Sequence, residues 1–417
     1  MRVRSSRQWW WTALLPAPLI AATLAGTLAK CQVYTPSLLE AVEGGPTTGG
    51  GVGFWSRPGP NGCFSAAYPT AEQHPSPQPG DSLPPIYLAI RSMRLGSLDP
   101  EGNPSKTAWQ DIGFDLDNTC TTSGTCPSDP SKPSVSCKPT GSAVAFDGNY
   151  CRDNTFGRLE ILASSISEIG GKYGLNDDAF NCALCVGAYN FILKISNYNG
   201  TANDDVVRLD AYPSPGLDPI LPWNCATADW KNHPCFTADL PLTVQDTAVQ
   251  QPRGGPDLPD AVLFSDTAYV REGYLVMILP PDSLLVFPGK KALATAFPVK
   301  FARGILTGRL GRARDGTWML EDGTVAGTTT EVETLKSFRE IGFCEGDPNF
   351  KLMKTFLHDN LDILASGEAS PAATCDSISI GLGFTATQAT AGKLVHVDPL
   401  VECGGDAGIK DAGAGGN

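Results

Sequence analysis

Residues 377–386, SISIGLGFTA, alternate apolar and small side chains at a period of two. In an extended chain, successive side chains point to opposite faces, so the apolar members of this stretch share one face. These are Ile378, Ile380, Leu382, Phe384 and Ala386. The pattern predicts a half-buried β-strand, and the same alternation recurs on both sides of the loop NYNGTANDD, at 191–195 and 207–209.

The composition extends this β pattern to most of the chain. There are 45 glycines and 34 prolines among 417 residues, and only 18% of residues are charged, which favours turns and short strands over long surface helices. Asp315-Gly316 and Asp322-Gly323 are hairpin signals on either side of TWMLE, so we predict a meander over 296–329.

Two segments have the pattern of helices. The stretch DNTFGRLEILASSISEIGG, residues 153–171, offers Asp153 or Asn154 as an N-cap before an apolar stripe, and a second helix is predicted after Asp347-Pro348. We therefore expect a mainly β body with a few helices, arranged as an antiparallel β-sandwich and held by disulfides.

The amino terminus has the pattern of an export signal. Three arginines precede an uncharged, mostly apolar run over 9–29 that ends in small residues. A run of this length can also span a bilayer as a permanent anchor, which is the alternative interpretation. We predict a signal peptide over 1–30 and an extracytoplasmic location, either in the cell envelope (outer membrane or periplasm) or secreted.

The segment Leu28-Ala29-Lys30-Cys31 resembles the lipobox of bacterial lipoproteins, with Lys30 where that pattern has a small residue. We predict lipidation at Cys31, which would anchor the protein to a membrane. The alternative is cleavage after Ala29 with Cys31 free or in a disulfide. Residues 31–85 are rich in Gly and Pro and are predicted to be a tether, followed by a folded body of one or two domains over 86–402 and a disordered tail over 403–417.

The 13 cysteines of the chain suit an oxidising compartment. If Cys31 carries lipid, an even number remains for pairing. The C-x-x-C motif at 182–185 has no second C-x-x-C that could complete a zinc site, so we interpret it as structural. The predicted disulfide cysteines are Cys120, Cys126, Cys137, Cys151, Cys182, Cys185, Cys225, Cys235, Cys344 and Cys375.

Two acidic segments bracket the cysteine-rich region, GFDLDNTC at 113–120 and DGNYCRDN at 147–154. They match an EF-hand loop only in part, but they can fold toward one another and share a calcium ion, because calcium prefers several hard oxygen ligands. The predicted ligands are Asp115, Asp117, Asn118, Asp147, Asn149 and Asp153. The alternative is that Asp and Asn serve here as turn formers beside disulfides.

Aromatic residues gather in AYPSPGLDPILPWNCATADW, which contains Tyr212, Trp223 and Trp230. Rings on a stiff loop can stack against sugars or contact a protein partner, although tryptophans also pack over disulfides. The four histidines are scattered, and we assign no catalytic residue. The net charge of −13 argues against nucleic acid as a partner.

The chain resembles a family of uncharacterised cysteine-rich envelope lipoproteins of high-GC bacteria. The resemblance lies in GFDLDNTC, DGNYCRDNTFG, ILKISNYNGTANDDVV, WMLEDGTVAG and CDSISIGLGFTA. It implies an exported, disulfide-bonded fold and assigns no activity. We therefore expect an envelope protein that binds glycan or protein without catalysis, the alternative being a secreted hydrolase with two catalytic carboxylates and a structural calcium ion.

Overall fold

A computed structural model of the protein describes most of the predicted body. The described residues are 55–58, 64–70, 80–121, 135–142, 144–165, 176–223, 230–250, 258–289, 296–399 and 403. The predicted signal peptide, Cys31 as the predicted lipidation site, and the predicted disulfide cysteines Cys126 and Cys225 lie outside these residues. None of the helices in these ranges is both long enough and apolar enough to cross a membrane.

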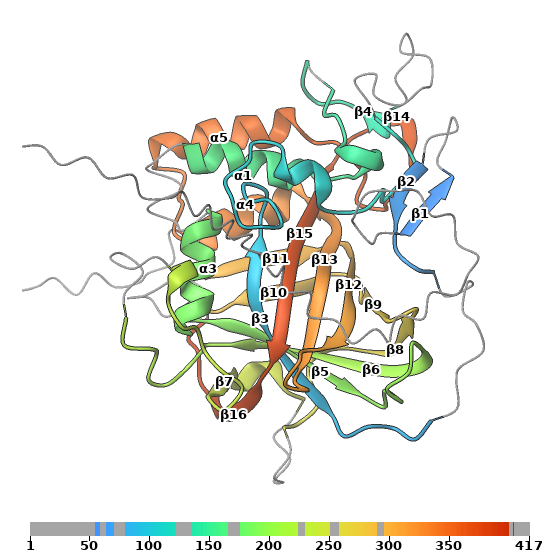
Figure 1. Ribbon diagram of the computed structural model, residues 1–417. Coiled ribbons are helices and arrows are strands. Elements are labelled where there is room, and N and C mark those ends of the chain that lie inside the picture. Colours follow the sequence, from blue (N-terminus) through green and yellow to red (C-terminus); the bar gives the residue numbers. More distant parts are fainter. Residues whose placement is uncertain are drawn as a thin grey trace, which may run out of the picture.

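A closed antiparallel barrel of eight strands occupies the centre of the molecule (Figure 1). Around the barrel the strand order is β12-β13-β15-β3-β5-β6-β8-β9, and β9 pairs with β12 to close it. The sandwich prediction is therefore wrong. The strands are β3 (Ile86–Arg94), β5 (Asn190–Ser196), β6 (Asn203–Ser214), β8 (Leu263–Arg271), β9 (Tyr274–Leu279), β12 (Arg303–Arg312), β13 (Trp318–Thr330) and β15 (Ser377–Gln388).

Register shifts in the long strands help to explain why the sheet closes. The β12–β13 register shifts at Gly308, and the β13–β15 register shifts between Leu320 and Gly323. Such bulges bend a strand and increase its twist, which brings distant edges together. Asp322, with φ +50°, lies at the second shift, so the Asp322-Gly323 pair forms a bulge inside β13 and not the predicted turn. The Asp315-Gly316 pair lies in the turn between β12 and β13.

The stretch 377–386 is β15, and it is more buried than its alternation predicts. Ile380, Leu382 and Phe384 belong to the main core, as expected for one apolar face. The opposite face is also covered, since Ser377 and Ser379 have no exposed surface. Helix α1 (Thr155–Ser165) packs on β15, and the backbone N–H of Thr155 donates to the Ser379 hydroxyl at 2.9 Å. Small side chains on this face let the helix approach the sheet closely.

Helices α1, α4 (Glu331–Glu340) and α5 (Pro348–Asp359) gather over one end of the barrel (Figure 1). Both predicted helices are present, and each has a side-chain cap at its amino end, although the predicted end of the first at Gly170-Gly171 lies outside the described residues. Asn154 accepts from the N–H of Gly157, and Asp347 accepts from the N–H of Asn349. The C-x-x-C motif lies on a further helix, α3 (Asp177–Val186), which ends at Gly187 in the left-handed conformation.

Four small sheets surround the barrel. Two of them pair distant segments in parallel, β4 (Cys137–Lys138) with β14 (Ser370–Thr374) and β7 (Pro241–Gln245) with β16 (Thr390–Val395). The others are the antiparallel pairs β1 (Trp55–Pro58) with β2 (Phe64–Ala67) and β10 (Ser283–Phe287) with β11 (Phe297–Phe301). β1 and β2 fall within the range predicted as a tether. Short 3-10 helices span Ala108–Asp111, Asn149–Cys151, Trp230–Asn232 and Asp246–Ala248.

Four disulfides connect the described segments, which confirms the prediction of a disulfide-bonded fold. They are Cys120–Cys151, Cys137–Cys375, Cys185–Cys235 and Cys344–Cys403. Cys182 is disulfide-bonded as well, which agrees with a structural role for the C-x-x-C motif. Cys403 was placed in the predicted tail, yet its bond to Cys344 ties it to the loop between α4 and α5.

Candidate metal centre

The two acidic segments of the sequence fold against one another. The Cys120–Cys151 disulfide joins them, with the Cα atoms 4.8 Å apart. The N–H of Asp153 donates to the carbonyl of Phe114 at 2.9 Å, and the N–H of Leu116 donates to Asp153 Oδ2 at 2.6 Å. This pairing agrees with the predicted shared site and also with the alternative of disulfide-linked turns, so the positions of the carboxylates have to distinguish the two.

Three carboxylates converge where the segments meet. Asp115, Asp117 and Asp153 each offer one oxygen, and these oxygens all lie within 4.8 Å of one another. The exposed fractions of the three residues are 2%, 5% and 2%. Carboxylate oxygens at this spacing can ligate one hard divalent cation, and burial makes their mutual repulsion strong in its absence.

Asp117 has one carboxylate oxygen with a hydrogen-bond donor and one without. Its Oδ1 accepts from the N–H of Thr119 at 2.8 Å. Its Oδ2 is buried, and no donor in the described part of the chain makes a hydrogen bond of normal geometry with it. Burial raises the pKa of Asp117, and this outweighs the opposing effect of the nearby Ser136 and Thr119 hydroxyls.

Asp147 extends the acidic region beyond the three converging carboxylates. Its Oδ2 accepts from the N–H of Thr121 at 2.6 Å, and its own N–H donates to the Thr121 carbonyl at 2.9 Å. Burial raises the pKa of Asp147 and of Asp153 well above the usual range, and the neighbouring carboxylates raise both further. The site therefore favours either bound protons or a bound cation.

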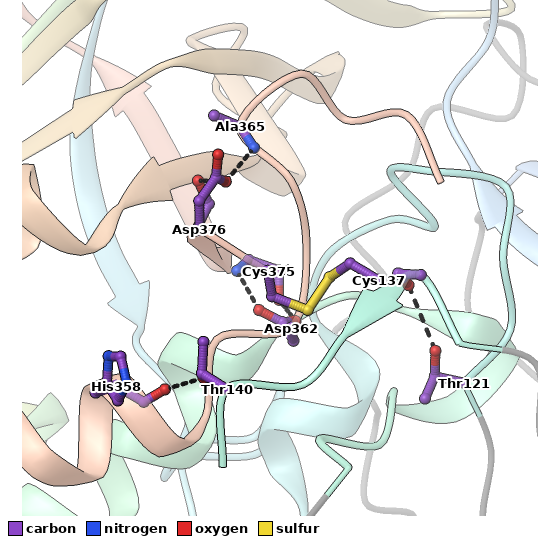
Figure 2. Close-up of a disulfide and its surroundings, with 11 residues drawn as sticks. Thr121, Cys137, Thr140, His358, Asp362, Ala365, Cys375 and Asp376 are labelled. Atoms are coloured by element: carbon purple, nitrogen blue, oxygen red, sulfur yellow. Dashed lines mark hydrogen bonds between the residues drawn. A yellow bond between two sulfur atoms is a disulfide. The ribbon is translucent and has the colours of Figure 1, made fainter. Parts of the chain in front are cut away.

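Asp362 belongs to the same acidic region, and the sequence analysis missed it. It follows α5, more than 200 residues from the other acids, and no local motif marks it. Figure 2 shows it beside the Cys137–Cys375 disulfide, which joins β4 to the chain just before β15. Burial raises the pKa of Asp362 to about 6, even though its carboxylate accepts from the N–H and hydroxyl of Ser379 at 2.9 and 2.5 Å.

The two asparagines predicted as calcium ligands are exposed, whereas the three converging carboxylates are buried. The side chain of Asn149 is exposed, and its Nδ2 donates to Asp111 at 2.9 Å, away from the three carboxylates. Asn118 is also exposed, and its φ of +61° places it in the left-handed conformation that Asn tolerates in tight loops. The structure thus brings together Asp115, Asp117 and Asp153, with Asp147 adjoining them.

The aromatic residues predicted to bind a ligand do not form one exposed surface. Tyr212 has no exposed surface, and its hydroxyl donates to the carbonyl of Pro259 at 2.9 Å, so its ring is closed to a ligand in this structure. Trp223 stacks on His233 with 5.0 Å between ring centroids. Trp230 donates to Asp178 at 3.3 Å, and both tryptophans are partly exposed.

The chain matches no known protein family, no curated protein and no solved structure. The chemistry of the acidic site therefore has to be inferred from its own residues. Its ligands would be hard oxygens, and it contains neither thiolate nor imidazole among the converging groups. Such a donor set suits calcium, magnesium or manganese better than zinc or copper.

Proposed function

We propose that the protein is an exported, disulfide-bonded protein of the cell envelope that binds one calcium ion through Asp115, Asp117 and Asp153. The observation that carries this proposal is the buried, unpartnered Oδ2 of Asp117 beside two more buried carboxylates. A buried anionic oxygen without a donor is costly, and a cation at this point would offset that cost for all three groups at once.

Calcium is the preferred ion for a geometric reason. It accepts six to eight oxygens in an irregular arrangement, so loop carbonyls and water can complete a shell begun by three carboxylates. Magnesium demands a nearly ideal octahedron and keeps more of its water. The ligands come from two segments that a disulfide already joins, so the ion would act as a second link between them.

A structural role for the ion agrees better with the burial than a catalytic role does. The three carboxylates are at most 5% exposed, which keeps a polymeric substrate away from them in this conformation. The burial therefore gives no support to the alternative of a hydrolase with two catalytic carboxylates. Binding of a glycan or an envelope protein remains our proposal for the biological role, with Trp223 and Trp230 as the partly exposed aromatic residues.

Export and anchoring complete the proposal. Disulfides between segments far apart in the chain, such as Cys137–Cys375, suit maturation in an oxidising compartment. The apolar amino-terminal run and Cys31 would supply export and a lipid anchor. Intact-mass measurement on protein from its native host tests this part, because removal of residues 1–30 and acylation of Cys31 change the mass by defined amounts.

The calcium site is tested by thermal unfolding of the EDTA-treated, disulfide-intact protein titrated with calcium and, separately, magnesium. A specific site stabilises the fold by about 2.7 kcal/mol when the free ion is at 100 times its Kd. We expect calcium to raise the Tm and Asp117→Asn to remove most of that rise. Asp205→Asn, at an exposed acid elsewhere, is the matched control.

Two outcomes would contradict the calcium proposal. One is an unchanged Tm for the wild type in millimolar calcium, together with no heat of binding by calorimetry. The other is a calcium response of Asp117→Asn equal to that of the wild type. A response to magnesium alone would assign the site to the smaller ion.

A further inference from the structure

A second unsatisfied carboxyl group lines an apolar cavity at the helical end of the barrel. The cavity is partly open to solvent and has a volume of about 60 Å³ between α1, α4, α5, β11 and the barrel strands. Its walls are mostly apolar and include Phe156, Phe297, Met353 and Ile380. The only carboxylate among its described lining residues is Glu160 of α1. This cavity does not include the acidic residues of the proposed calcium site, so it is a separate feature.

Glu160 is buried with half of its carboxyl group unsatisfied. The residue is 4% exposed, and its Oε1 lies 3.2 Å from the Ser97 hydroxyl, whose single proton Asp177 Oδ2 also accepts at 2.8 Å. Its Oε2 is buried and makes no hydrogen bond to any of the described residues. An unsatisfied polar atom beside an apolar cavity is costly, and a bound molecule with one polar atom would relieve that cost.

The groups around Glu160 favour its neutral form. Burial is the main cause, and the adjacent Asp177 of α3 is the second, and together they raise the pKa of Glu160 to about 8. Asp177 is itself engaged, since it accepts from the N–H groups of Leu95 and Ser97 at 2.5 and 2.9 Å. At neutral pH the Glu160 carboxyl therefore keeps a proton that it can donate.

The other charged groups near the cavity compensate each other. Lys300 of β11 also lines it, and its ammonium group binds Glu333 of α4 at 2.9 Å and lies 3.9 Å from Asp282. The side chain of Lys300 is 31% exposed, so this pair lies toward solvent. A charged ligand would have to leave water without finding a free counter-ion among these groups, which is unfavourable.

We infer that this cavity binds a small uncharged amphiphile, a short aliphatic or aromatic molecule with one hydrogen-bond acceptor that faces Glu160. The apolar walls supply affinity through burial of the hydrocarbon part. The carboxyl proton of Glu160 supplies orientation through a hydrogen bond to a carbonyl or hydroxyl oxygen of the ligand. This inference goes beyond the proposed calcium site and does not depend on it.

The test measures binding of 2-pentanone to the disulfide-intact protein by NMR shift titration at pH 6 and pH 9.5, with pentanoate and pentylamine as charged probes of the same length. We expect saturable binding of the ketone at pH 6 and weaker binding of both charged probes. Loss of the proton from a group with a pKa of about 8 should weaken ketone binding about 30-fold at pH 9.5.

Two variants test whether Glu160 causes the pH dependence of ketone binding. Glu160→Gln keeps a donor and cannot ionise, so its ketone affinity should stay the same at both pH values. Glu345→Gln, at a side chain that is 71% exposed, is the matched control and should retain the wild-type pH dependence. The inference is overturned if the ketone does not bind at pH 6, which leaves water as the occupant, or if wild-type affinity is equal at both pH values.

Discussion

Two buried carboxylate sites in this molecule balance their charge in opposite ways. Asp210 on β6 has no exposed surface, and Arg208 binds both of its oxygens at 2.8 Å. The N–H of Ala261 adds a third hydrogen bond at 3.0 Å. Asp117 is nearly as buried, but its neighbours are acids, and its Oδ2 has no described donor.

The difference shows where each site obtains its positive charge. Arg208 and Asp210 are two residues apart on one strand, so they face the same side and the strand carries its own counter-ion. The pair is also supported by Asp266, at 2.6 Å from Arg208. The acidic site lacks such an internal cation at Asp117 and Asp153 in the described part of the chain, so a proton or a metal ion must take that place.

The largest expected effect comes from removing the internal counter-ion. Arg208→Ala leaves Asp210 buried and charged without its partner, so we expect a loss of about 3 to 5 kcal/mol in the free energy of unfolding, measured with urea. The double variant Arg208→Ala/Asp210→Asn should recover part of this loss. A loss below about 1 kcal/mol would mean that the Arg208–Asp210 pair is not the compensated site described above.

Glu160, a further buried carboxylate, gives a pH-dependent effect that is intermediate in size over one pH unit. Its pKa of about 8 lies above the ordinary value of 4.5, so its contribution to stability is present below pH 4.5 and is lost as the pH rises through 8. Wild-type protein should lose up to about 1.4 kcal/mol per pH unit relative to Glu160→Gln within this window. Urea unfolding of both proteins at pH 5, 7 and 9 measures the difference, and parallel curves would contradict it.

Removing one carboxylate charge should change the stability of the protein in opposite directions at Asp117 and at Asp210, by a smaller amount. In EDTA, Asp117→Asn removes one of several repelling buried charges, so we expect metal-free protein to gain about 1 kcal/mol. Asp210→Asn removes an attractive partner of Arg208 and should destabilise the protein. Denaturant midpoints of both variants in the same buffer test the comparison, which fails if the two substitutions shift stability in the same direction.

The smallest effect is expected at an exposed ion pair. Lys393 and Asp218 lie 3.2 Å apart, and their side chains are 68% and 56% exposed. Exposed pairs contribute little because water screens them, so Lys393→Ala should change the free energy of unfolding by less than about 1 kcal/mol. A larger loss, seen by the same urea measurement, would mean that charge pairing at the surface contributes as much here as it does at buried sites.

Local signals of the sequence predicted several elements correctly. Asn154 and Asp347 cap the helices expected after them, and Asp315-Gly316 lies in the expected turn. The sequence also allows the two acidic segments, each with a cysteine, to fold toward one another, and Cys120–Cys151 joins them. These features depend on residues within a few positions of each other, or on a cysteine pair whose chemistry restricts its geometry.

Other features were missed because distant segments create them. The sequence places Tyr212 in a stretch rich in aromatic residues that was predicted to be a loop. In the structure it lies on the barrel strand β6, where its side chain is buried in an apolar cluster separate from the main core. Asp362 joins the acidic region only because β15 and the Cys137–Cys375 disulfide bring its segment there. The cavity at Glu160 combines side chains from three helices and the barrel strands, so no contiguous motif describes it.

The sequence by itself determined which stretches are extended, where helices begin, and that paired cysteines would hold the fold, because backbone preferences, capping and side-chain periodicity act locally. Tertiary structure alone decided that the sheet closes and that β15 is buried on both faces. Closure requires β9 to pair with β12 and β3 to pair with β15, and those hydrogen bonds join edges whose meeting depends on the accumulated twist of all eight strands.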